Sequence, residues 1–240
     1  MAATASSSAA FTRLESLTVL LMLLLLVSLA WPVLAGQRAR SERAVCSNNL
    51  RQVGQAFRIW ASEHGDLNPW LLEYTGWLKH SKGGTRNHPL GQEAWLHFSW
   101  VSNELHTPAV LACPADASVR VATDFGAASG RGFLNRAFAG RAVSYVISAH
   151  SRYDDPQSLL SGDRNVRPSS LEGCSYNLVL PGWREGANPP SWTNALHGLS
   201  GNLLFSDGRV TEASGADLLS SVARSPNAFN TNVLHVFYPR

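Results

Sequence analysis

Residues 11–35 read FTRLESLTVLLMLLLLVSLAWPVLA, and the interpretation of the whole chain depends on this stretch. It contains no charged residue from Ser16 to Ala35. A helix of about 20 apolar residues crosses a hydrocarbon core of roughly 30 Å, so the stretch predicts a transmembrane helix. Glu15 stands at its edge, where a carboxylate needs a polar surrounding or a charged partner. Pro32 predicts a kink near its far end.

The overall composition excludes one large class of function. The chain has 240 residues, which is room for one good-sized domain and an anchor. The net charge is +3 and charged residues make up 15% of the chain. Because the basic residues are scattered rather than gathered in a stripe, we expect no binding of nucleic acid.

A helical pattern continues beyond the apolar run. Large or apolar residues recur at spacings of 4, 3, 4 and 3, which places them on one helix face: Cys46, Leu50, Val53, Phe57 and Trp60. Gly65 is a typical helix stop. The sequence therefore predicts one helix from residue 11 to residue 64, apolar in its first half and amphipathic in its second.

Beyond residue 66, short apolar runs alternate with turn residues, which is typical of strands. The candidate strands are 142–148, 175–180, 202–206 and 209–212, and a short helix is predicted within 91–105. Asp207-Gly208 lies between two of these strands and predicts a tight hairpin turn. The expected fold is thus α+β: a long N-terminal helix, half transmembrane and half amphipathic, packed on a small antiparallel sheet with long loops.

Catalytic chemistry finds little support in the residue patterns. His197 and Asp207 form half of a catalytic triad, but no G-x-S-x-G nucleophile motif accompanies them. A structural role in the hairpin explains both residues, with Asp207 making an Asx-type turn. We therefore expect no enzyme activity, and we expect Asp207→Asn to leave the fold nearly unchanged.

The start of the chain resembles the N-terminus of the prepilin family. Phe-Thr-x-Leu-Glu followed by a long apolar run matches the cleavage and methylation motif of these proteins. The resemblance implies that a prepilin peptidase cuts between Ala10 and Phe11 and that the new amine of Phe11 is methylated. It also implies that Glu15 faces the N-terminal amine of a neighbouring subunit, which would compensate a carboxylate in apolar surroundings.

Further landmarks resemble a prepilin-like group that is common in planctomycetes and verrucomicrobia. His197 is followed after nine residues by Asp207-Gly208, as in the C-terminal signature of that group. Other motifs of that group occur in this chain in the same order. They are the segment that begins at Cys46, Trp60-Ala61 together with 64–66, Cys113-Pro114-Ala115-Asp116, Ser144-Tyr145 and 162–165.

This resemblance implies a structural subunit of a type IV pilus-like or type II secretion pseudopilus-like assembly. Its parts would be a leader at 1–10, a transmembrane segment at 11–35, an amphipathic continuation at 36–65 and an exported head at 66–240. The expected location is the inner membrane, single-pass, with the head outside the cytoplasm. Expected partners are the prepilin peptidase, other pilin-like subunits, inner-membrane assembly proteins and the membrane itself.

Cofactors and cysteines receive narrower predictions. No cofactor is expected, although some pseudopilins hold calcium, for which Asp163, Asn165 and Asp207 are the oxygen donors to test. The three cysteines are Cys46, Cys113 and Cys174. A Cys46–Cys113 disulfide would join the long helix to the head, and three buried thiols are the alternative.

Two alternatives stay open at this point. Residues 13–35 also have the layout of a secretory signal peptide, with a cut after Ala35 that would release the rest of the chain. The second alternative is that the chain is an exported surface- or carbohydrate-binding module, either soluble or anchored. Six tryptophans in the head could serve such binding: Trp70, Trp77, Trp95, Trp100, Trp183 and Trp192.

Overall fold

The structure is a computed structural model that describes residues 12–74, 83–128, 130–174, 178–184, 186–225 and 233–239. The side chains of residues 30–35 and 172–179 lie outside the description. The chain divides into two units, residues 1–41 and residues 42–240, and each is described by itself.

Helix α1 (Arg13–Ser62) begins in the first unit, and its start is capped by its own side chains. The backbone N–H of Thr12 donates to Glu15 Oε2 at 2.8 Å, and the N–H of Glu15 donates to Thr12 Oγ1 at 3.3 Å. This reciprocal pair is a capping box, which satisfies amide groups that have no partner within the helix. Glu15 thus has a local role at the start of α1.

The predicted transmembrane segment is not found. Among the residues that the structure describes, no helix is both long and apolar enough to cross a membrane. This finding overturns the transmembrane segment at 11–35 and the single-pass inner-membrane location with an exported head.

The predicted fold class was also wrong about the second unit, whose sheet is not small. Seven strands follow one another in the order β4-β5-β9-β1-β2-β7-β8, and every pairing is antiparallel. The strands are β1 (Tyr145–Ser148), β2 (Leu159–Asp163), β4 (Ser170–Cys174), β5 (Leu178–Trp183), β7 (Gly201–Phe205), β8 (Val210–Ala213) and β9 (Leu234–Phe237); β3 (Val166–Arg167) and β6 (Ser191–Trp192) pair separately.

Further helices of this unit were only partly expected. They are α2 (Ala94–Trp100), α3 (Ser102–Leu105) and α4 (Gly215–Arg224), with the short 3₁₀ turns η1 (Pro69–Leu71), η2 (Pro108–Leu111) and η3 (Ala139–Ala142). Helices α2 and α3 fall within the predicted helical stretch 91–105. Helix α4 was missed, although Ser214 and Asp217 form a capping box at its start.

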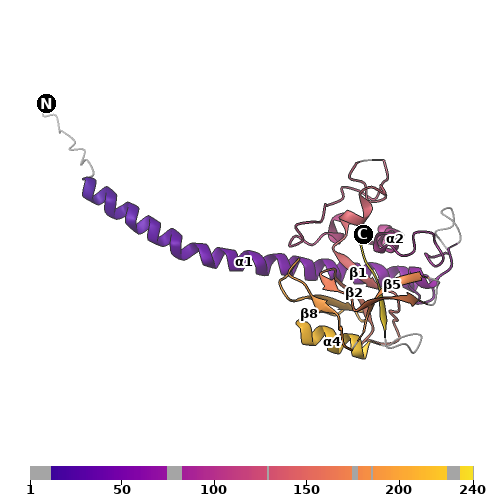
Figure 1. The fold of residues 1–240 in the computed structure, drawn as a ribbon. Coiled ribbons are helices and arrows are strands. Elements are labelled where there is room, and N and C mark those ends of the chain that lie inside the picture. Colours follow the sequence, from indigo (N-terminus) through magenta and orange to yellow (C-terminus); the bar gives the residue numbers. More distant parts are fainter. Residues whose placement is uncertain are drawn as a thin grey trace. The chain divides into compact units, whose positions relative to one another are not determined.

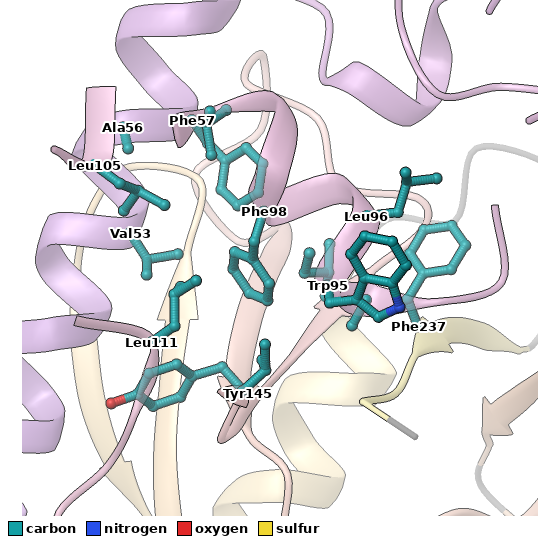
Figure 2. Packing of buried hydrophobic residues seen from close by; sticks show 14 of the residues in the cluster. Val53, Ala56, Phe57, Trp95, Leu96, Phe98, Leu105, Leu111, Tyr145 and Phe237 are labelled. Atoms are coloured by element: carbon teal, nitrogen blue, oxygen red, sulfur yellow. The ribbon is translucent and has the colours of Figure 1, made fainter. Parts of the chain in front are cut away.

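One face of the sheet packs against α1 and α2. The spacing prediction for α1 is confirmed here, since Cys46, Leu50, Val53, Phe57 and Trp60 are all buried. Figure 2 shows Val53 and Phe57 of α1 beside Phe98 of α2 and Tyr145 of β1. The rings of Phe57 and Phe98 lie 5.7 Å apart between centroids, within the range of favourable aromatic contacts.

The other face of the sheet carries a second core. Side chains alternate along each strand, so Val146 points away from its neighbours Tyr145 and Ile147 and joins this cluster instead. Leu218 and Val222 of α4 cover it, as the position of α4 against the sheet in Figure 1 shows. Strands β1, β2, β7 and β9 are therefore buried on both faces, which explains why they read as short apolar runs without clear alternation.

Candidate functional site

A disulfide joins α1 to the loop that follows η2. It links Cys46 to Cys113, which are 67 residues apart in sequence and 5.0 Å apart between Cα atoms. Both side chains are completely buried. Of the two alternatives that the sequence left open for these cysteines, the structure contains the disulfide. The side chain of Cys174 lies outside the described residues.

His197 stands directly beside this disulfide. Its Nε2 lies 3.4 Å from Cys113 Sγ and 3.5 Å from Asp163 Oδ2, and the side chains of His197 and Asp163 are 2% and 0% exposed. Arg43 of α1 holds the loop that carries His197 and Ser200. Its Nη2 donates to the carbonyl of His197 at 2.7 Å and to Ser200 Oγ at 3.0 Å. The same guanidinium forms an ion pair with Glu212 on β8.

Asp163 ends strand β2 and is held by the facing strand β7. Its Oδ2 accepts from the backbone N–H of Asn202 at 2.7 Å and from Asn202 Nδ2 at 2.9 Å. Its Oδ1 is buried and has no hydrogen-bond partner. Such an orphaned buried oxygen is uncommon, because it loses its water without replacement.

Both partners of the His197–Asp163 contact are electrically neutral over much of the acidic range. Burial raises the pKa of Asp163 to about 7, against the hydrogen bonds from Asn202 and the charge of Arg43, which act to lower it. Burial, helped by the positive charge of Arg43, lowers the pKa of His197 to about 4. Near pH 6 the contact therefore joins a neutral imidazole to a carboxyl group that still holds its proton, and it is not an ion pair.

A second buried carboxylate lies in the loop after the disulfide. Asp116 accepts from Arg164 Nε at 2.8 Å and from Ser144 Oγ at 2.8 Å, while Ser144 Oγ accepts from the backbone N–H of Cys113 at 3.0 Å. Burial acts to raise the pKa of Asp116, but the hydrogen bonds from Ser118, Arg164 and Ser144 together bring it below its usual value. This carboxylate is charged and paired.

Asn165 holds the loop that carries His197. Its Nδ2 donates to the carbonyls of Thr193 and Ser200, both at 3.0 Å. The loop is thereby tied to the end of β2, two residues after Asp163. This arrangement explains why an amide side chain is needed at this position, since a carboxylate could not donate to carbonyl oxygens.

Most of the sequence landmarks thus meet at one place. Segments far apart in the sequence supply Cys46, Cys113, Asp116, Ser144, Asp163, Arg164, Asn165 and His197 to a single buried polar cluster. We call it the disulfide cluster. The pairing of His197 with Asp163 was missed, although both residues stood within noted landmarks.

Asp207 is separate from the disulfide cluster. It lies in the turn after β7, whereas Asp163 Oδ2 binds Asn202 near the opposite end of that strand. Asp207 Oδ1 accepts from the backbone N–H of Arg209 at 2.9 Å, and Gly208 has a φ of +86°. This is an Asx turn at the tip of the β7–β8 hairpin. The three calcium donors, Asp163, Asn165 and Asp207, are therefore not brought together.

The residues tied to processing have a different outcome. Ala10 and Phe11 lie outside the described residues, so the cleavage position stays a prediction. Glu15 is described, and its partner in this chain is Thr12. The hydrogen bonds from the backbone and side chain of Thr12 lower the pKa of Glu15, which keeps the carboxylate charged.

Two members of the disulfide cluster, Cys113 and Asp116, line a surface pocket of about 510 Å³. The side chains of His197, Asp163 and both cysteines are buried, and Asp207, which the sequence offered as the other half of a triad, lies at the far end of β7. The disulfide and the hydrogen bonds of the cluster connect α1, the loop after η2, the end of β2 and the 193–200 loop to one another.

The tryptophans do not form an aromatic platform. Trp70, Trp95, Trp100, Trp183 and Trp192 are all at most 7% exposed, and Trp77 lies outside the described residues. Sugar-binding platforms need an exposed ring face, which these five side chains do not offer.

Comparison with known proteins returned no relative: no family model, no curated protein and no solved structure matches this chain. The comparisons therefore give no support to the pilin and type II secretion assignment that the sequence had suggested.

Proposed function

We propose that the chain is a structural subunit of a pilus-like assembly, in which the apolar first part of α1 packs against the same segment of further copies. The observation that carries the proposal is the exposure of that segment. Nine consecutive residues from Val19 to Val27 are large, apolar and 50–69% exposed.

The distribution of these side chains indicates several neighbours rather than one. Nine consecutive positions cover every side of a helix, because each turn takes about 3.6 residues. A helix that is apolar all round is typically buried on all sides. A single groove would cover only one stripe, whereas a bundle of like helices covers the whole circumference.

The magnitude of the burial is sufficient for assembly. Burying a Val, Leu or Met side chain contributes about 1.5 kcal/mol or more, so nine contribute roughly 13 kcal/mol. Association costs about 4–15 kcal/mol in lost translational and rotational freedom. The two magnitudes are comparable for one helix, and each copy in a bundle contributes its own segment.

Glu15 gains a second role under this proposal. The capping box with Thr12 accounts for its place at the start of α1. The prepilin resemblance adds that its charge meets the amine of a neighbouring subunit after a cut before Phe11. The two roles can be separated, since glutamine also serves at this position of a capping box but carries no charge.

The test uses the full-length chain, produced in cells, with variants at Glu15 and in the apolar segment. Assembly is measured by sedimentation and electron microscopy, helix content by circular dichroism, and the N-terminus by mass spectrometry. We expect Glu15→Gln to keep the helix content and reduce assembly at least tenfold. A double variant, Leu21→Ser with Leu24→Ser, should abolish assembly.

Each arm has its own contrary result. If Glu15→Gln assembles like the wild type, the charge of Glu15 has no role between subunits and only its capping role stands. If the Leu21→Ser and Leu24→Ser variant assembles like the wild type, the apolar segment is not the contact and the proposed function is wrong.

A further inference from the structure

The disulfide cluster contains the atoms of a metal site. Cys46 Sγ, Cys113 Sγ and His197 Nε2 all lie within 4.8 Å of one another. Asp163 adds a carboxylate, with Oδ2 at 3.5 Å from His197 Nε2 and with Oδ1 buried and unpartnered. Two sulfurs, one imidazole and one carboxylate are ligand types that zinc accepts.

The distances between these atoms match a tetrahedral zinc centre. With Zn–S near 2.3 Å and Zn–N or Zn–O near 2.0–2.1 Å, neighbouring sulfur and nitrogen ligands stand about 3.5 Å apart and nitrogen and oxygen ligands about 3.3 Å apart. The structure has 3.4 Å between Cys113 Sγ and His197 Nε2, and 3.5 Å between His197 Nε2 and Asp163 Oδ2. The two sulfurs must separate to about 3.8 Å as the disulfide opens.

We propose that the reduced chain binds one zinc ion through Cys46, Cys113, His197 and Asp163, so that the same position is closed either by a disulfide or by a metal. The proposal is independent of the proposed function, because it concerns the second unit alone.

The surroundings suit a charged metal centre. Two thiolates, one carboxylate and one Zn²⁺ sum to a charge of about −1, and the guanidinium of Arg43 lies beside the His197 loop to offset it. Asn202 donates to Asp163 Oδ2 through its backbone and its side chain, which orients the carboxylate as outer partners of zinc ligands commonly do. Asp163 Oδ1, which is buried and has no hydrogen-bond partner, would then coordinate the zinc ion or accept a hydrogen bond.

The chemistry balances with a thiol or phosphine reductant. A dithiol reduces the Cys46–Cys113 bond to two thiols and becomes a cyclic disulfide itself. A phosphine does the same with one water molecule, which supplies the two thiol protons and the oxygen of the phosphine oxide that forms. Each thiol then loses one proton as its thiolate binds Zn²⁺, and neutral His197 binds through the lone pair of Nε2. Without metal, the reduced site would bury two thiols beside a carboxyl group.

The test refolds the full-length chain in mild detergent with a phosphine reductant and zinc chloride, followed by dialysis. Because all the ligands are buried, metal must enter during refolding. We expect about one zinc per reduced chain by elemental analysis, none in the oxidised chain, and a thiolate-to-metal absorption band when Co²⁺ replaces Zn²⁺. His197→Ala should weaken zinc binding at least tenfold, as losing one ligand of four does.

Matched controls use residues outside the cluster. Cys174→Ser removes the remaining cysteine and His106→Asn removes an exposed histidine, and both should keep the metal. Folding of His197→Ala is checked by near-ultraviolet circular dichroism of its oxidised form, where no metal is involved. The proposal is overturned if the reduced wild type binds no zinc, if a Cys46→Ser and Cys113→Ser double variant still binds it, or if Cys174→Ser loses it.

Discussion

Reduction of the Cys46–Cys113 disulfide should lower the stability of the second unit by a large and calculable amount. The bond closes a loop with a sequence separation of 67 residues, and the loop-entropy relation for that length gives about 4.4 kcal/mol at 25 °C. Comparing oxidised with reduced wild type isolates the cross-link, because no side-chain volume is removed from the core.

The assay is urea unfolding followed by tryptophan fluorescence, with a chelator present in both samples so that no metal contributes. With a slope near 3 kcal/mol per molar urea, a loss of about 4.4 kcal/mol moves the midpoint down by roughly 1.5 M. A chain with both Cys46 and Cys113 replaced by alanine serves as the control, and reductant should leave its midpoint unchanged.

A shift below about 1 kcal/mol on reduction would refute the reasoning. It would mean that the other contacts of the disulfide cluster keep the loop closed in the unfolded ensemble or that the bond is not formed. If reductant also shifts the urea midpoint of the double alanine control, the shift must arise from Cys174 and not from the Cys46–Cys113 bond.

Three further outcomes follow from the same geometry. Because the pKa of Asp163 is raised to about 7, the folded chain holds a proton that the unfolded chain has lost, so its contribution to stability falls as pH rises from about 4 to about 7. In the wild type this fall opposes the rise that the lowered pKa of His197 produces between about pH 4 and 6.5, so Asp163→Asn should leave the rise alone. A urea midpoint of Asp163→Asn that does not rise with pH would contradict the His197 assignment, and parallel pH profiles of wild type and variant would contradict the Asp163 assignment. Gly201→Ala would place its Cβ 2.4 Å from a ring carbon of Trp192 and should cost about 1–3 kcal/mol in thermal or urea unfolding, whereas an unchanged midpoint would show that the ring moves freely. Asp207→Asn should change stability by less than about 0.5 kcal/mol, since asparagine makes the same Asx turn, and loss of folding would contradict the turn assignment.

The local features that the sequence predicted best depend on short-range chemistry. The spacing from Cys46 to Trp60 identified the buried face of α1, and Asp207-Gly208 identified the turn of the β7–β8 hairpin. Both follow from the geometry of neighbouring residues in one element, so they need no knowledge of the rest of the chain.

Strand β2 shows why the sheet was underestimated. Its sequence, LLSGD, contains a glycine, a serine and an aspartate, and it lacks the alternation of a half-exposed strand. It is buried on both faces, and its polar ends find partners across the sheet, such as Asn202 for Asp163. Those partners lie 39 residues away, beyond any local pattern.

The disulfide cluster could be anticipated only in pieces. The landmarks around Cys113, Asp163 and His197 were each visible, but their meeting depends on the pairing of β2 with both β1 and β7. The first pairing brings Ser144 near Arg164, and the second sets the 193–200 loop against Asp163.

The most direct test of the proposed assembly is photo-cross-linking in cells with a photoreactive amino acid at Leu21, compared with the same probe at Leu199. Both positions are 68% exposed, so they differ in location and not in accessibility. The account predicts a ladder of cross-linked multimers of this chain from position 21, lost in Glu15→Gln, and none from position 199. Monomers alone from position 21, or equal ladders from both positions, would contradict it.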